Sequence, residues 1–392
     1  MQQPRRPADS PRSAQLWSSP GADVARSYDP DTPHGAHKQR DDTVADLHSG
    51  PERPLTTGWR APLESAPQER LWTGFPPAWV PERAVVAWCA VANAAAQFQP
   101  VTMVVNPDQI TEARRRVSAA VELLPMATDD AWLRDSGPTF VLDADGQLGA
   151  VDWIFNGWGA RSWARWDHDA LVAAAVGEAA SAAPIVSTLV NEGGGILVDG
   201  QGTVVVTQTV QLDPFRNPYV DRARVEAELA RTIGATKVIW LPQGLTADYG
   251  GFGTRGHVDM VAAIPRPGLM LLHQQDDPSH PDHEVTARLR AILAASTDAT
   301  GRPWELQALP APKRLQADGE WLDWNYVNHA VVNGGVIACS FDDPSDAPAQ
   351  EILREVYPGR EVVAVDARPI FELGGGIHCI TQHQPRAGKA SA

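Results

Sequence analysis

The chain has 392 residues, and its 48 Asp and Glu against 33 Lys and Arg give a formal net charge of −15 at pH 7. This balance argues against a nucleic-acid binder, which needs a basic surface for phosphates. No apolar run reaches the roughly 18 residues of a membrane span, and three cysteines cannot form a disulfide framework. Because the N-terminus also lacks the pattern of a secretory signal, we expect a cytoplasmic protein without nucleic-acid or membrane partners.

The first 65 residues predict a disordered tail. Residues 1–60 contain eight basic and eight acidic side chains, so the charge of −15 belongs to the remainder of the chain. The segment is rich in Pro, Ser, Asp and Arg and buries too little apolar area to offset its ordering entropy. We expect one folded α/β domain over 66–386 and a frayed C-terminus over 387–392.

From residue 66 onward, helix and strand patterns alternate. An Ala-rich pattern over 84–98 predicts a buried helix, 101–105 predicts an apolar strand, and 109–122 predicts an amphipathic helix. Further helices are expected over 168–181, 219–233, 283–296 and 346–356. 

Strand pairs of a common layout lie between these helices. Each begins with polar residues and glycine, runs apolar, turns at a glycine-containing turn and runs apolar again. The segments with this pattern are 192–207, 257–272, 326–340 and, in a shorter form, 374–382. Their similar spacing predicts about five α/β units in a propeller-like or barrel-like repeat, whose polar clusters converge on one axis. The hairpins argue against a doubly wound parallel sheet.

The three cysteines differ in their surroundings. Cys89 lies in the Ala-rich helix pattern and Cys339 in an apolar strand pattern, as expected of small core residues. Cys379 follows three glycines and His378, and glycine lets a backbone approach a ligand closely. A nucleophilic cysteine needs access and a group that favours its thiolate. The residues alone therefore leave Cys379 open between a nucleophile and a buried thiol.

Two further clusters carry side chains suited to chemistry. On the expected strand, His257 and Asp259 point to one face, where a general acid/base and a carboxylate for a cation can share a site. Asp135 precedes a Gly-Pro turn, where its carboxylate can face a cleft beside the apolar Trp132. Each cluster also fits a structural role, as a capped strand start or as a turn with an internal Arg134–Asp135 pair.

Six motifs taken together resemble one family. They are DDAWLRDSGPTFV, VDWIFNGWG, NEGGGILVDGQGTVVVT, GTRGHVDM, NYVNHAVVNGGVIA and GGGIHCITQHQP. In order and spacing they are similar to the motifs of agmatine deiminases, which belong to the guanidine-modifying enzymes. The resemblance covers the chain from about residue 66 and implies the pentein fold, a five-bladed pseudo-symmetric α/β propeller.

The resemblance also implies an activity. Agmatine deiminases hydrolyse the guanidine of agmatine to N-carbamoylputrescine and ammonia, in putrescine biosynthesis, through an amidino-cysteine intermediate. It implies Cys379 as the nucleophile, His257 as the general acid/base, and Asp135 and Asp259 as the carboxylates that hold the guanidinium. The implied substrate-binding residues are Trp132, Glu192, Asn328, Gly375 and Gly376. No metal or organic cofactor is expected, the implied partner is a small cationic guanidine, and the family resemblance suggests a homo-oligomer.

One segment departs from the family pattern. In several relatives an acidic residue stands just before the GHVD motif, where this chain has GGFGTR over 250–255. The nearest carboxylate is Asp248, and Arg255 favours a carboxylate-bearing guanidine. A deiminase of a guanidino acid or of peptidyl-arginine is therefore an alternative. Two others are a non-catalytic pentein binding module and a metal-dependent hydrolase with the ligands His257, Asp259, His378 and Cys379.

Overall fold

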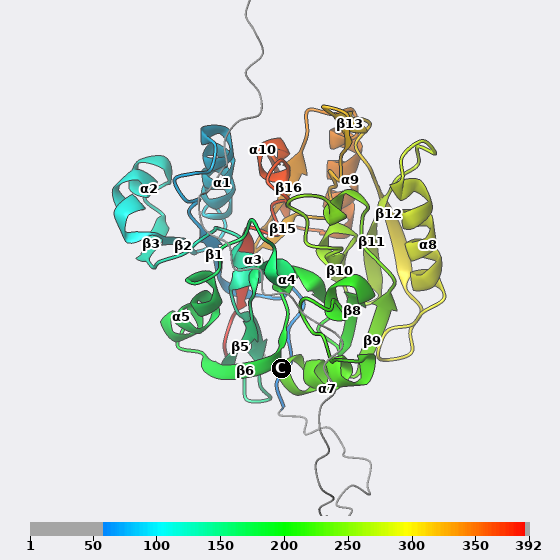
Figure 1. The fold of residues 1–392 in the computed structure, drawn as a ribbon, viewed down its shortest axis with the longest axis horizontal. Coiled ribbons are helices and arrows are strands. Elements are labelled where there is room, and N and C mark those ends of the chain that lie inside the picture. Colours follow the sequence, from blue (N-terminus) through cyan, green and yellow to red (C-terminus); the bar gives the residue numbers. More distant parts are fainter. Residues whose placement is uncertain (1–57, 389–392) are drawn as a thin grey trace, which may run out of the picture. The chain divides into compact units, whose positions relative to one another are not determined.

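An antiparallel hairpin followed by a parallel strand is the repeating unit of the fold (Figure 1). The computed structural model describes residues 58–388, which lie in the unit formed by Arg53–Ala392. The expected tail up to residue 57 and the final residues 389–392 fall outside the described residues. The domain boundaries at residues 65 and 386 therefore stay predictions.

Four sheets of the described chain have three strands, of which the first two pair antiparallel and the last two parallel. They are β4 (Thr139–Leu142), β5 (Leu148–Ile154) and β6 (Ala183–Val190); β7 (Ile196–Val198), β8 (Thr203–Thr207) and β9 (Lys237–Leu241); β10 (Ala262–Arg266), β11 (Leu269–Gln274) and β12 (Glu305–Pro310); and β15 (Ala330–Val332), β16 (Gly335–Ser340) and β17 (Glu361–Asp366). A small hairpin separates the last two sheets, with strands β13 (Gln316–Ala317) and β14 (Glu320–Trp321).

A further sheet joins the two ends of the described chain. β18 pairs antiparallel with β1, and β1, β2 and β3 continue in parallel. Its strands are β18 (Thr381–Pro385), β1 (Gln68–Gly74), β2 (Val101–Val105) and β3 (Val121–Pro125). The same hairpin-plus-parallel order thus appears here with strands from opposite ends of the sequence.

Helices make the crossovers that parallel strand pairs require. The longer ones are α1 (Glu82–Ala95), α2 (Ile110–Arg116), α5 (Val172–Ala179), α7 (Arg222–Ile233), α8 (Asp282–Ala294) and α9 (Asp346–Val356). The short ones are α3 (Leu133–Ser136), α4 (Gly157–Ala160), α6 (Gln208–Gln211) and α10 (Arg368–Phe371). In Figure 1, α2, α5, α7 and α8 lie outside the strands, and α3 and α4 lie between the sheets. The α/β fold is as predicted; the five-bladed propeller stays a prediction, because no closed sheet joins the five sheets of the described residues.

The sequence of α7 shows why these segments become helices. Asp221 caps the helix by accepting a hydrogen bond from a backbone N–H of the first turn at 2.8 Å. Val225, Leu229 and Ile233 recur every four residues and are all buried, so one face packs on the core. Gly234 then ends the helix with a φ of 73°, which glycine adopts without strain.

Two local predictions are wrong. The helix expected over 109–122 ends at Arg116, and Val121 already begins β3, where five residues pair with β2. The strand expected at His257 is a short 3₁₀ turn over Val258–Met260, and the strand begins only at Ala262. The remaining predicted helices match α1, α5, α7, α8 and α9 within a few residues.

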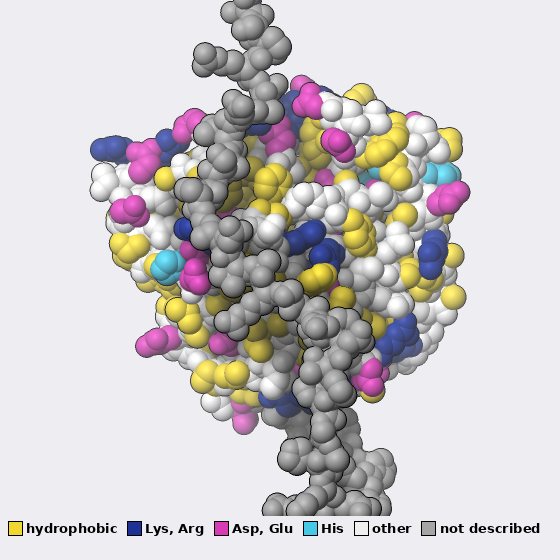
Figure 2. Space-filling model, in the orientation of Figure 1, with side chains coloured by type: hydrophobic (Ala, Val, Ile, Leu, Met, Phe, Trp, Pro, Cys, Tyr) yellow, Lys and Arg dark blue, Asp and Glu magenta, His cyan; other side chains and the backbone are white. Residues whose placement is uncertain are grey.

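The surface of the described part carries its acidic charge in a scattered form. Figure 2 shows Asp and Glu side chains around the edge of one face, interspersed with Lys and Arg side chains. Among residues 58–388, no helix combines the length and apolarity that crossing a membrane requires.

A matched pair of leucines tests the packing of α7. Leu229 is fully buried, whereas Leu171 is 65% exposed. We predict that Leu229→Ala lowers the free energy of unfolding by about 2–5 kcal/mol, because it leaves a cavity in the core. Leu171→Ala changes it by no more than about 0.5 kcal/mol. Urea denaturation of both variants measures the difference, and equal losses would contradict the packing described.

Candidate active site

Each of the five sheets in the described chain presents polar side chains from the residues just before its first strand. Asp135 lies in α3, ahead of β4. The corresponding residues ahead of β7, β10, β15 and β18 are Glu192, His257 with Asp259, Asn328, and Cys379. None of these six side chains is more than 4% exposed, so together they form a buried polar site.

Asp135 has one carboxylate oxygen fixed by an indole. Its Oδ2 accepts a hydrogen bond from Nε1 of Trp158 at 2.8 Å, and its Oδ1 accepts one from the backbone N–H of Gly194 at 3.1 Å. Oδ1 also lies 3.8 Å from Nδ1 of His257. Burial raises the pKa of Asp135 to about 6, although the charge of His257 opposes the rise. The site therefore holds a carboxylate that a further cation would stabilise.

His257 is held by a buried ion pair. Its Nε2 lies 3.2 Å from Oε2 of Glu192, and Nε of Arg216 donates to the two oxygens of Glu192 at 2.8 and 3.1 Å. Burial would raise the pKa of Glu192, but Arg216 and the bond to His257 lower it to about 2. Burial would likewise lower the pKa of His257, but Asp135 and Glu192 raise it to about 9. The imidazole is therefore protonated at neutral pH, and its Nδ1 has no hydrogen-bond partner among the described residues.

Asn328 fixes the position of the cysteine. Its Oδ1 accepts from the backbone N–H of His378 at 3.0 Å and of Cys379 at 3.4 Å, and its Nδ2 lies 3.3 Å from Sγ. Sγ also lies 3.6 Å from Oδ2 of Asp259. Burial and the charges of Asp259 and Asp135 raise the pKa of the Cys379 thiol well above its usual value. The resting residue is therefore a neutral thiol.

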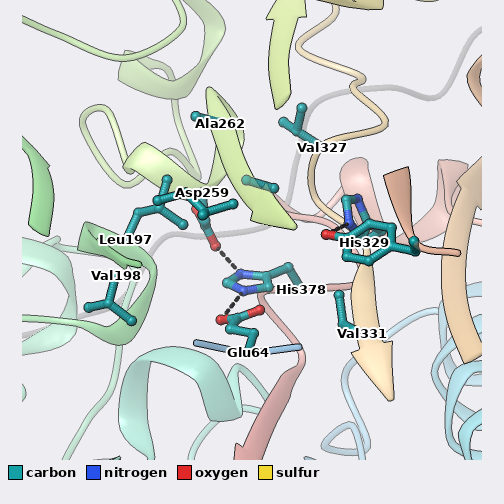
Figure 3. A pocket seen from close by; sticks show the side chains of 12 residues that line it. Glu64, Leu197, Val198, Asp259, Ala262, Val327, His329, Val331 and His378 are labelled. Carbon is teal, nitrogen blue, oxygen red and sulfur yellow. Dashed lines mark hydrogen bonds and ion pairs between the residues drawn. The ribbon is translucent and has the colours of Figure 1, made fainter. Parts of the chain in front are cut away.

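The imidazole of His378 lies between two carboxylates (Figure 3). Its Nδ1 is 2.8 Å from Oδ2 of Asp259, and its Nε2 is 2.8 Å from Oε1 of Glu64. The same oxygen of Glu64 accepts from Nη1 of Arg134 at 2.9 Å. Burial would raise the pKa of Asp259, but His378 lowers it below its usual value. Oδ1 of Asp259 has no hydrogen-bond partner among residues 58–388.

A glycine leaves a space among these polar atoms. A Cβ on Gly194 would lie 2.5 Å from Nδ1 of His257 and 3.0 Å from both Oδ1 of Asp135 and Oδ2 of Asp259. Any side chain at this position would therefore displace them. Because this residue is glycine, the two carboxylates and the imidazole can converge closely on its backbone.

Two more glycines bring the backbone against the cysteine and its neighbours. A Cβ on Gly375 would lie 2.6 Å from the Trp132 ring and 3.1 Å from Sγ of Cys379. A Cβ on Gly376 would lie 2.4 Å from Oδ1 of Asn328. Trp132 thus lies beside the cysteine, with only the glycine backbone between them.

Aromatic rings extend from Asp135 toward the surface. Trp158, which binds Asp135, stacks on Trp163 with ring centroids 5.3 Å apart. Trp163 in turn meets Phe252 edge-on at 5.4 Å, and Phe252 is 54% exposed. The segment 250–253 is therefore connected to the buried carboxylate by an aromatic chain.

Comparison with known proteins shows which family has a sequence similar to this chain. Residues 60–385 match the family of Porphyromonas-type peptidyl-arginine deiminases. The chain belongs to this family. A protein of Streptomyces avermitilis, provisionally named an agmatine deiminase, is 52% identical over 343 residues, which are 85% of this chain and 99% of the relative.

Two agmatine deiminases are also similar to this chain over most of its length. The agmatine deiminase of Pseudomonas fluorescens is 39% identical over 374 residues, covering 88% of this chain and 99% of the relative. The solved structure of agmatine deiminase from Enterococcus faecalis superposes with a TM-score of 0.81 at 31% identity, covering 86% of this chain and 98% of that one. The match spans whole proteins and includes every segment of the site.

The structure of this family member brings together all nine residues that the sequence indicated. They are Cys379, His257, Asp135, Asp259, Trp132, Glu192, Asn328, Gly375 and Gly376. His257 and Asp259 do share the site, but the predicted cause, a common face of a strand, is wrong. A 3₁₀ turn over Val258–Met260 positions both residues instead. Cys89 and Cys339 are buried, as expected of core residues.

Several residues at the site were not predicted. Arg216 and Glu64 received no role, and Trp158 was noticed only as part of a motif. Arg134 bonds to Glu64 and Gln382 rather than forming the considered pair with its neighbour Asp135. Contacts such as that of Glu64, 314 residues from His378, leave no local pattern in the sequence.

The pKa of His257 gives a direct test of the site. We predict that His257 titrates near pH 9 and that Glu192→Gln moves the midpoint down by about one unit, because a raising charge is lost. Since the folded pKa lies above the ordinary 6.5, protonated His257 stabilises the fold below pH 6.5, and this contribution is lost as pH rises through 9. NMR of ¹³C-labelled histidine measures both midpoints; a wild-type midpoint near 6.5 would contradict the geometry.

Proposed function

We propose that this protein is an agmatine deiminase, a hydrolase that converts agmatine and water to N-carbamoylputrescine and ammonia. The observation that carries the proposal is the convergence of two carboxylates and an imidazole around Gly194, next to a cysteine. A guanidinium is a planar cation that two carboxylates bind through paired hydrogen bonds. The 37–52% identity to agmatine deiminases over most of the chain supports the same activity.

The carboxylates select and orient the substrate. Oδ1 of Asp259 is free to accept a guanidinium N–H, and Asp135 presents Oδ1 to the same space. Burial makes each of these bonds stronger than it would be in water. Because the guanidinium is then fixed, its central carbon is held against Sγ of Cys379.

Binding of the cation also activates the nucleophile. The thiol is neutral in the resting site because Asp259 and Asp135 oppose a further negative charge. A bound guanidinium offsets these two charges and lowers the pKa of Cys379. The thiol then releases its proton to water, and the thiolate attacks the guanidinium carbon and forms a tetrahedral adduct.

His257 carries the protons. Its protonated ring donates to the leaving nitrogen, so that ammonia departs and an amidino-cysteine remains. The now neutral imidazole takes a proton from water, which attacks the same carbon. Expulsion of the thiolate leaves the ureido product. Glu192 stabilises the protonated ring, Asn328 positions the thiol, and Trp132 offers an apolar wall for the aliphatic chain.

Arg255 and Asp248 are the two charged side chains near the GHVD motif that the sequence offered for contact with the far end of the substrate. Arg255 is engaged elsewhere, since its Nη1 donates to Asp213 at 2.9 Å and its guanidinium lies over the Phe215 ring. Asp248 accepts hydrogen bonds from Thr254 and from the backbone N–H of His257, so it shapes the turn. Both side chains considered from sequence therefore already have partners within the protein.

A carboxylate from another segment takes their place. A surface pocket of about 640 Å³ runs between segment 250–253 and Gly374, close to the cysteine loop, and Asp323 lies in its wall. Burial and the neighbouring Asp248 raise the pKa of Asp323 to about 7, so an ammonium group would stabilise its ionised form. Aromatic side chains line the same pocket and suit a cation as well: Phe252, Trp321, Trp324 and Phe371. The pocket favours an amine over a second carboxylate.

Three further parts of the proposal rest on the sequence. The five sheets form the blades of a pentein propeller, which their shared strand order supports. The sequence places the catalytic domain over 66–386, and the contacts of Glu64 favour a start that includes this residue. The protein is a cytoplasmic homo-oligomer, which gel filtration with light scattering would test.

A substrate panel tests the activity. We predict that the wild type releases ammonia from agmatine faster than from arginine, guanidinobutyrate or peptidyl-arginine. Cys379→Ala lowers the turnover of agmatine at least about 1,000-fold, because the covalent step is lost. Cys89→Ala, at a buried cysteine of α1, keeps it. Acid quenching and mass spectrometry identify the amidino adduct on Cys379. Substantial turnover by Cys379→Ala would refute the mechanism.

Exchange of one charge tests the specificity. We predict that Asp323→Asn raises the KM for agmatine about tenfold, as expected from the loss of one ion pair worth about 1.4 kcal/mol. The KM for guanidinobutyrate stays the same or falls, because its carboxylate no longer meets a like charge. The control is Asp342→Asn, whose side chain is 85% exposed. If the KM values for both substrates change in parallel, Asp323 does not contact the end of the substrate opposite the guanidinium.

A further inference from the structure

Glu64 lies outside every motif that suggested the function, yet it contacts the site. Its Oε1 is 2.8 Å from Nε2 of His378, whose Nδ1 is 2.8 Å from Oδ2 of Asp259. An ionised carboxylate only accepts hydrogen bonds, so both bonds require both ring nitrogens to carry protons. His378 is therefore an imidazolium next to Cys379 in the chain.

The surroundings show that Glu64 is the group that maintains this charge. Burial and Arg134 both lower the pKa of His378, and only Glu64 and Asp259 raise it. The other imidazoles nearby, His329 and His383, have pKa values lowered to about 4 by burial and are neutral. Loss of the charge of Glu64 would leave His378 with one carboxylate and an adjacent arginine.

The dyad of Glu64 and His378 is largely enclosed by protein, with 20% of the Glu64 side chain and 7% of the His378 side chain exposed. A cavity of only about 20 Å³ borders it, which is room for about one water molecule. Figure 3 shows Leu197, Val198 and Val331 around it. In such an apolar surrounding, charges act on one another with little screening.

We propose that Glu64 is a positioning residue of the active site, which holds the His378 imidazolium and thereby Asp259 beside the reacting thiol. The imidazolium compensates one oxygen of Asp259 and leaves Oδ1 for the substrate. Because Oδ2 of Asp259 lies 3.6 Å from Sγ of Cys379, compensation of its charge by the imidazolium also weakens its opposition to the thiolate. The inference deepens the proposed deiminase activity and rests on it.

The pH dependence of Glu64→Gln tests the inference. Glutamine keeps an accepting oxygen but not the charge, so His378 loses its proton at a lower pH than in the wild type. We expect the ratio of variant to wild-type kcat for agmatine to be highest near pH 6. By pH 9 the ratio is about tenfold lower, which corresponds to a decrease of about one unit in the pKa of His378. KM does not rise, because a neutral His378 leaves Asp259 no less attractive to a cation.

Three variants separate positioning from mere structure. Glu69→Gln removes a half-exposed charge from β1 and is expected to match the wild type. Glu64→Asp keeps the charge and restores much of the activity. His378→Asn keeps a donor for Asp259 but has no proton to lose, so its activity is low by a factor that does not vary with pH. A ratio for Glu64→Gln that is constant from pH 6 to 9 would overturn the proposal.

A second readout does not depend on the substrate. The rate of Cys379 alkylation by iodoacetamide, followed by mass spectrometry of its peptide, reports the thiolate at each pH. We expect Glu64→Gln to slow it at pH 8 and above relative to the wild type. If agmatine is not a substrate but alkylation changes in this way, the proposed function fails and Glu64 keeps its role. Unchanged alkylation, with a constant ratio of kcat, refutes the role of Glu64 alone.

Discussion

The burial of Asp135 and Asp259 beside an open space is the constraint on which the rest of the site depends. A buried carboxylate without a partner is costly, and two of them near one thiol are more so. The fold tolerates the pair because each has one oxygen satisfied by its own donor, Trp158 or His378. Oδ1 of Asp259 is the oxygen of the pair that has no hydrogen-bond partner among the described residues, so it can accept from a guanidinium.

The remaining charges of the site are arranged to sum to zero. One series runs through Arg134, Glu64, His378 and Asp259, and another through Arg255, Asp213, Arg216, Glu192, His257 and Asp135. Cation and anion alternate in both, with each imidazole protonated. The two series end at Asp259 and Asp135, which both lie beside Gly194. A bound guanidinium then adds one positive charge for which the site has no further anion. The chemistry thus begins from a neutral site that becomes positive on binding, which suits a thiol that must ionise.

The sequence predicted the elements that are repeated or set by neighbouring residues. It did not predict the side-chain contacts between distant parts of the chain. Glycine-flanked hairpins were visible because turns and alternation are local, and the motifs around Cys379 and His257 identified the reacting groups. Glu64 was assigned to the tail because the segment before it is rich in Pro, Ser, Asp and Arg, and its partners His378 and Arg134 are 314 and 70 residues away. The residue proposed for specificity is a second case: Arg255 lies next to the GHVD motif in sequence, whereas Asp323 comes from a different segment of the fold.

The pairing of β18 with β1 has a consequence for how the protein acquires its activity. Cys379 stands two residues before β18, and β18 pairs with β1, a strand made some 300 residues earlier. During synthesis the N-terminal sheets can form as they leave the ribosome. The nucleophile cannot be positioned until the last strand has emerged and docked. Among the described residues, the other side chains of the site all precede β18 in the chain, so the site is complete only once this pairing has formed.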